Sequence, residues 1–179
     1  MNLINAFGLL NMINEDLDGY QEEYKNYVIQ HKERVKQFAD WLKENCPDLF
    51  EDVDVEEFDN MIEEHDASKF SEEEFEPYAQ KWFGDKKKTF EYEAAWTHHW
   101  MNNEHHPEYW LGEDMPLIYI LEMLCDWGSF SIASGDMKEL SDFYFNKAKA
   151  DPEKNLSGAT QELIEDILER INSVISREE

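Results

Sequence analysis

The sequence predicts an all-α fold, a single-domain bundle of helices over residues 1–179. Apolar residues recur at steps of three and four along most of the chain, which is typical of amphipathic helices. Short polar segments containing proline or glycine separate these stretches, and no alternating run rich in valine or isoleucine indicates a sheet. With 41% hydrophobic and 14% aromatic residues in a chain of 179, the composition is sufficient for a core.

Two helices are predicted in the first half of the chain. The first covers about residues 21–45 and ends at Pro47, which cannot continue it. An acidic joint over 48–55 follows, and a second helix then runs through His65. The periodicity places two histidines on the apolar faces of these helices, together with Tyr24, Val28, Val35, Phe38 and Leu42 on the first and Phe58, Met61 and Ile62 on the second.

The second half begins with a short amphipathic segment between Pro77 and residues 84–88, where three lysines predict a solvated turn. A helix over about 90–102 precedes Pro107, and a strongly apolar helix is predicted over 117–132. Helices over about 138–148 and 160–176 contain no histidine. We therefore interpret residues 136–179 as packing and cover.

The net charge of this chain is unusually negative. Sixteen basic and 42 acidic residues give a net charge of −26. Such a surface repels phosphate backbones and anionic lipids, so we expect neither a nucleic acid polymer nor a membrane as partner. A small phosphorylated ligand is compatible with this charge because a bound divalent cation can reverse the field locally.

The sequence favours a cytoplasmic location. The N-terminal residues lack a basic segment of the kind that opens a signal peptide. No window approaches the roughly 18 uninterrupted apolar residues of a spanning helix. Cys46 and Cys125 form no metal-binding or disulfide pattern and are expected to be reduced. The oligomeric state cannot be read from these features.

The histidines suggest a metal site. A single histidine on an apolar face is usually a core residue with a hydrogen-bond partner, but all six histidines lie in four short clusters, and one of them is followed directly by an aspartate. Imidazole and carboxylate are common ligands of Zn, Fe, Mn and Ni ions. Asp126 lies within an apolar run, where a carboxylate is costly unless it is paired or bound to a metal. The clusters are His31, His65-Asp66, His98-His99 and His105-His106.

This order of residues resembles the HD-domain superfamily of metal-dependent phosphohydrolases. The pattern of that superfamily is a histidine, a His-Asp pair and a later aspartate on a helical bundle. Residues 65–69, His-Asp-Ala-Ser-Lys, are similar to its HDxGK stretch, with Ser68 where glycine is frequent. Residues 98–110 also resemble a group of small bacterial and phage proteins. The resemblance covers about residues 20–132, which predicts an HD-like metal-binding core there.

The resemblance implies one divalent ion, Mn, Fe, Ni, Co or Zn, or two such ions. Dinuclear members hold the second ion with two later histidines, for which His99 and His106 are the first choices and their neighbours are rivals. A separation of seven residues is shorter than usual in that family. The implied ligands of the first ion are His31, His65, Asp66 and Asp126.

Other residues are candidates for catalysis and substrate binding. Lys69 matches the family lysine and would contact a substrate phosphate. His98 or His105 could protonate the leaving oxygen or orient the attacking water. Trp100 and Trp110, with Trp96 and Tyr109, could stack on a base, although aromatic residues at helical spacing more often belong to a core.

Three functions are compatible with these residues. The first is a phosphohydrolase for a small phosphorylated metabolite, with a nucleotide preferred. The second is an HD-type di-iron oxygenase, which would need both later histidines as ligands. The third is a non-enzymatic acidic protein that binds a basic partner, but such a protein has no use for four histidine clusters.

Overall fold

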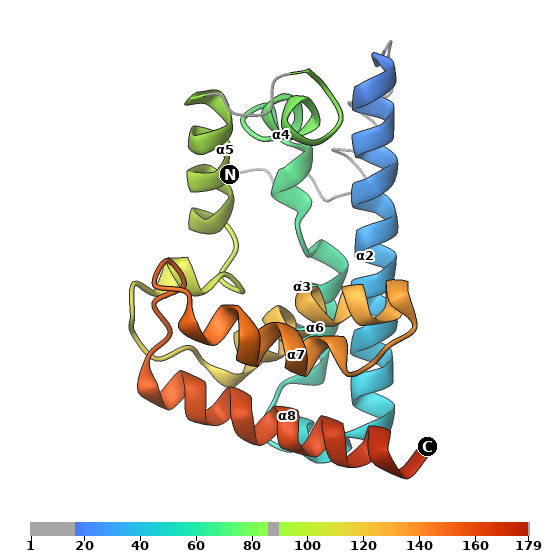
Figure 1. The fold of residues 1–179 in the computed structure, drawn as a ribbon, viewed down its shortest axis with the longest axis vertical. Helices are drawn as coiled ribbons and strands as arrows, with labels where there is room; N and C mark the ends of the chain where they lie inside the picture. The colour runs from blue at the N-terminus through green and yellow to red at the C-terminus, as the bar shows by residue number, and fades with distance from the viewer. Residues whose placement is uncertain (1–16, 86–89, 179) are drawn as a thin grey trace. The chain divides into compact units, whose positions relative to one another are not determined.

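The computed structural model describes residues 17–85 and 90–178, and these are helical with no β-strand among them (Figure 1). The predicted all-α fold is confirmed. The predicted lysine turn at 86–88 lies outside the described residues.

The described chain forms two compact units, and each is assembled from two separate stretches of sequence. Of the described residues, unit 1 contains 17–32, 64–85 and 90–103, and unit 2 contains 33–63 and 104–178. Helix α2 (Gly19–Asn45) contributes to both units. The predicted single domain with an HD-like core over 20–132 stays a prediction.

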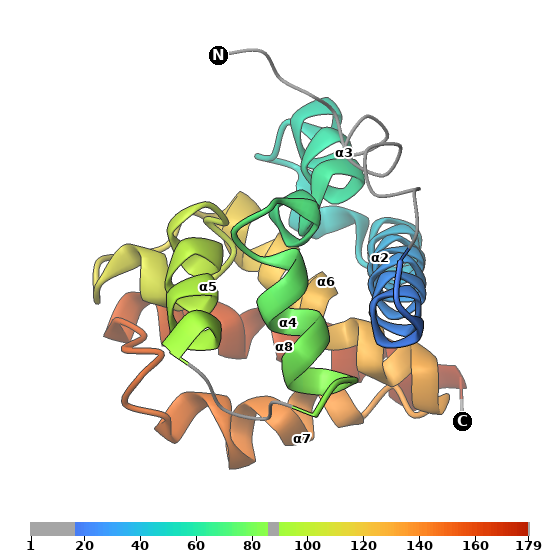
Figure 2. The ribbon, with the colours of Figure 1, turned by 90° about the horizontal axis from the view of Figure 1, so that it is seen from above.

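Unit 1 contains the first part of α2, the 3₁₀ helix η2 (Ala67–Phe70), α4 (Phe75–Trp82) and α5 (Phe90–Met101). Helix α4 lies between the first part of α2 and α5, as the two views of the ribbon show (Figure 1, Figure 2). Pro77 is the third residue of α4, where its missing N–H interrupts no helical hydrogen bond. The core of this unit is largely aromatic and consists of Tyr24, Val28, Phe70, Phe75, Tyr78, Ala79 and Ala95.

Unit 2 has the larger core. Its helices are the second part of α2, α3 (Val55–Glu64, whose last residue belongs to unit 1), α6 (Leu117–Ser134), α7 (Glu139–Asn146) and α8 (Gly158–Glu178). Three short 3₁₀ helices complete it: η1 (Pro47–Phe50), η3 (Pro107–Trp110) and η4 (Ala148–Ala150). The apolar face of α8 is buried, through Ile164, Ile167, Leu168, Ile171 and Ile175.

Helix α6 is the most apolar element of unit 2. By length and composition alone it could cross a membrane, and among the described residues it is the one helix that meets those criteria. However, 56% of its 18-residue window is buried inside the protein, as is typical of a core helix in a soluble protein. Cys125 of α6 and Cys46 are both free thiols and buried, and burial raises the pKa of each.

Gly128 allows α6 to approach α2 closely within unit 2. A Cβ atom at this position would lie 2.5 Å from the ring of Phe38, which is itself fully buried. We therefore expect Gly128→Ala to lower the free energy of unfolding by about 1–3 kcal/mol, because the buried ring has little room to move. Urea denaturation followed by circular dichroism would measure this change.

The matched control is Gly158→Ala, at the first residue of α8. A Cβ atom there meets nothing within 4 Å, so this variant should be as stable as the parent or slightly more stable. Equal stability of the Gly128→Ala variant and the parent would contradict the close packing described here.

Candidate metal centre

The central residue of unit 1 is Asp66, which lies in a turn. The sequence predicted a helix through His65, but α3 ends at Glu64 and the His-Asp pair follows it outside the helix. The backbone of Asp66 is left-handed, with φ of 56°, a conformation that aspartate adopts more readily than most residues. This reversal directs the chain into η2. Lys32 of α2 donates a hydrogen bond to the carbonyl oxygen of His65 and so holds the turn.

The short helix η2 brings Lys69 to Asp66. Residues three apart eclipse each other in a 3₁₀ helix, and Asp66 is the residue that precedes this one. The ammonium nitrogen of Lys69 accordingly lies 2.5 Å from Oδ2 of Asp66. The predicted His-Asp-x-x-Lys spacing thus forms a direct ion pair.

Three imidazoles surround the same carboxylate, each from a different segment of unit 1. Nε2 of His31, on α2, lies 3.4 Å from Oδ2 of Asp66, and Nε2 of His65 lies 3.5 Å from the same oxygen. Nε2 of His99, on α5, lies 3.2 Å from Oδ1. All four residues are buried. The predicted inward orientation of His31 and His65 is confirmed.

These donor atoms fit a divalent metal ion. One donor atom each of His31, His65 and Asp66 lies within 4.8 Å of the others. Tetrahedral ligands about 2.1 Å from an ion are about 3.4 Å apart, which is close to the observed spacing of the nitrogen and oxygen atoms. Imidazole and carboxylate are also the donor set that Zn, Fe, Mn, Co and Ni accept. The buried His/Asp group of unit 1 could therefore hold a metal ion.

The surrounding charges keep Asp66 ionised. Burial alone would raise the pKa of this carboxyl, but the charge of Lys69, the nearby His65 and the hydrogen bonds from His31 and His99 hold it well below its ordinary value. For His99, burial alone would lower the pKa, but the hydrogen bonds to Asp66 and Glu74 and the charge of Asp66 raise it. An ionised carboxylate is the form that binds a metal ion.

Glu74 was missed by the sequence analysis, and it fixes the orientation of His99. This carboxylate is fully buried, and its Oε2 lies 2.9 Å from Nδ1 of His99. With its Nδ1 proton donated to Glu74, His99 could give up the Nε2 proton that faces Asp66 and offer the lone pair of Nε2 to a metal ion instead. The other oxygen of Glu74 lies 2.7 Å from Nδ1 of His98, whose side chain is 34% exposed. Glu74 thus connects a buried and a partly exposed histidine.

Ser68 and Asn103 complete the hydrogen bonds around His99. Asn103 donates from Nδ2 to the hydroxyl of Ser68 at 2.8 Å and to the carbonyl oxygen of His99 at 2.6 Å. The hydroxyl of Ser68 lies 3.2 Å from Nδ1 of His99. Ser68 therefore contributes to the hydrogen-bond network that positions this imidazole.

The family comparison covers most of both units. The family of unknown function DUF5662 matches residues 20–170. The chain belongs to DUF5662. Neither a curated protein nor a solved structure matches it.

Unit 2 of the DUF5662 chain contains the other predicted ligands. Nδ1 of His105 lies 3.2 Å from Oε1 of Glu122, and both side chains are buried. The ring of His105 lies 4.3 Å from that of His106, and a donor atom of His105 lies within 4.8 Å of one of Asp126. Asp126 is half-buried. The participation of these residues in one site with unit 1 stays a prediction.

The tryptophans predicted to bind substrate lie in different units. Trp110 packs against the core of unit 2, where its indole donates to the carbonyl oxygen of Glu104 at 2.7 Å and its ring lies 5.4 Å from Tyr119. Trp100, in unit 1, is half-buried. Trp96 lies nearer the candidate centre, with its ring 6.0 Å from that of His99. Their roles in binding stay predictions.

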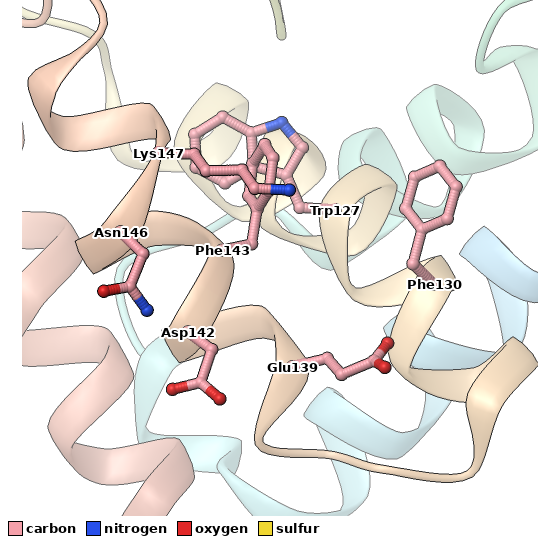
Figure 3. Close-up of a pocket in the computed structure, with 7 residues that line it drawn as sticks. All are labelled: Trp127, Phe130, Glu139, Asp142, Phe143, Asn146 and Lys147. Carbon is pink, nitrogen blue, oxygen red and sulfur yellow. The ribbon is translucent and has the colours of Figure 1, made fainter.

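A cavity of about 490 Å³ lies in unit 2, between α6 and α7 (Figure 3). It contains none of the predicted site residues. Its lining combines three aromatic rings with two carboxylates, an amide and an ammonium. Because both signs of charge are present, the lining favours neither anionic nor cationic ligands. These residues are Trp127, Phe130, Glu139, Asp142, Phe143, Asn146 and Lys147.

The role of Glu74 in this DUF5662 chain can be tested through metal affinity. We expect Glu74→Ala to weaken binding of Co²⁺ by about 10- to 100-fold, because His99 loses the carboxylate that orients it. Calorimetric titration would measure the dissociation constant. Glu73→Ala is the control, since the adjacent side chain is exposed and should leave affinity unchanged. Equal affinities for the two variants would contradict the orienting role.

Proposed function

We propose that this protein is a metal-dependent phosphohydrolase that acts on a small phosphorylated metabolite. The observation that supports this proposal is the arrangement at Asp66, where three buried imidazoles and one ammonium converge on a single carboxylate. The imidazoles and the carboxylate provide ligands for a cation, and the ammonium provides a partner for an anion. A phosphoryl group approaching a divalent ion needs both.

Each residue has a distinct role in this proposal. The ligands are His31, His65, Asp66 and His99, and Glu74 orients the last of them. A divalent ion would supply Lewis-acid chemistry, because it polarises phosphoryl oxygens and acidifies a water molecule. Lys69 would offset the charge that develops on the phosphoryl group. His98 is partly exposed and hydrogen-bonded to Glu74, so it can exchange protons with solvent and protonate a leaving oxygen.

A nucleotide is the substrate class that we propose. The net charge of −26 disfavours long phosphate polymers but imposes a smaller cost on a single nucleotide. Trp96 is half-buried beside His99 and offers a ring for base stacking. A cytoplasmic location, where nucleotides are abundant, is part of the same proposal.

One observation favours a second candidate, the HD-type di-iron oxygenase. The two oxygens of Asp66 face different histidines: Oδ2 lies near His31 and His65, and Oδ1 lies near His99. A carboxylate with this environment suits a bridge between two ions. Iron content of two per chain, with a spectrum of coupled irons, would favour the oxygenase over the phosphohydrolase.

The first experiment is elemental analysis of protein purified without chelator, for the parent and for His65→Ala and Asp66→Ala. We expect stoichiometric transition metal in the parent and at least a tenfold loss in both variants, because each removes a ligand. Phosphate release from a panel of nucleotides with Mn²⁺, Co²⁺ and Ni²⁺ would then measure activity, which both variants should lose.

The control for this experiment is Glu73→Ala, which changes an exposed side chain and should retain metal and turnover. A parent protein that is fully loaded with metal but inert towards the whole panel would count against a phosphohydrolase. A parent that binds none of the ions would refute the metal centre. The hypothesis left to test would then be a non-enzymatic acidic protein that binds a basic partner.

A further inference from the structure

We infer that Lys69 occupies the place of the metal ion as counter-ion of Asp66, so that metal binding releases its ammonium for an anionic ligand. This inference rests on the proposed function and adds an order to it, with the divalent ion first and the phosphate second. The observation behind it is the ion pair of Lys69 with Asp66, in which the ammonium nitrogen lies 2.5 Å from Oδ2, closer than the three imidazoles lie to this carboxylate.

Lys69 and a divalent ion compete for the same oxygen. The ammonium contacts Oδ2 of Asp66, and this is also the oxygen that lies nearest His31 and His65. An ion bound to these two imidazoles and this oxygen would stand within a few ångströms of the ammonium. Two cations at such a distance repel each other strongly in a buried site. The ammonium must therefore withdraw when the ion binds.

The side chain of Lys69 is able to make this movement. It is 18% exposed, whereas the carboxylate that it contacts is 1% exposed, so a route to solvent exists on the lysine side. Four methylene groups let the ammonium swing while the backbone of η2 stays in place. A withdrawn ammonium would lie at the edge of the metal site, facing the approach of an anion. Before metal binds, the same charge is neutralised by Asp66 and has little attraction for phosphate.

The test compares Co²⁺ affinity of the parent with Lys69→Met and Lys69→Arg, measured by calorimetry without any phosphate. Methionine keeps an unbranched side chain, one atom shorter than that of lysine, and removes the charge, so we expect Co²⁺ to bind at least about tenfold more tightly, the usual effect of removing one nearby like charge. Arginine keeps the charge and should leave affinity near that of the parent. Equal or weaker binding by Lys69→Met, with an unchanged melting temperature, would overturn the inference.

The second measurement uses inorganic phosphate as the probe of the released ammonium. In the parent, phosphate should bind at least tenfold more tightly after Zn²⁺ is added, and Lys69→Met should lose most of that gain. Phosphate binding that is equally tight without metal, or a gain that survives in Lys69→Met, would overturn the order. Neither measurement depends on turnover. Exchange at Lys69 without hydrolysis would refute only the phosphohydrolase, and a parent that binds no metal would refute both.

Discussion

The buried charge of Asp66 is the constraint on which unit 1 depends. An isolated carboxylate in a protein interior is so unfavourable that it takes up a proton unless partners compensate it. Here the compensation comes from three separate segments: α2 supplies His31, the turn and η2 supply His65 and Lys69, and α5 supplies His99. The helices of this unit must pack in the register that brings these groups to one point. The site and the local fold are therefore specified together.

The aromatic core of unit 1 supports the same register. The ring centroid of Tyr78, on α4, lies 5.9 Å from that of His99. It lies 6.1 Å from the ring centroid of Tyr24, on α2, with which the ring of Tyr78 is stacked. One tyrosine thus links the two helices that carry His31 and His99. Burial and the nearby charge of Glu74 raise the pKa of Tyr78, so its hydroxyl stays neutral. A neutral ring can fill the space beside a charged carboxylate without adding a second buried charge.

The sequence predicted the helices well because their apolar periodicity is strong. Helices α2, α6 and α8 begin and end within a few residues of the expected limits. The His-Asp pair was misplaced on a helix because periodicity cannot register a single left-handed residue such as Asp66. Glu74 was overlooked because it stands in an acidic run over residues 72–74, which reads as solvated surface. Its position four residues before the buried Tyr78 was the available signal for an inward side chain.

The acidity of the chain influences the order in which ligands can bind at Asp66. Among the described residues, three carboxylates are buried against histidines: Asp66 and Glu74 in unit 1 and Glu122 in unit 2. Most of the remaining carboxylates stay on the surface and create a negative field that attracts divalent cations and repels phosphate. A phosphorylated ligand can enter such a field only where positive charge is concentrated. Asp66 neutralises Lys69 in the metal-free protein, so that concentration arises only once a divalent ion has taken its place. The negative surface therefore favours the metal ion as the first ligand and leaves the phosphate dependent on it.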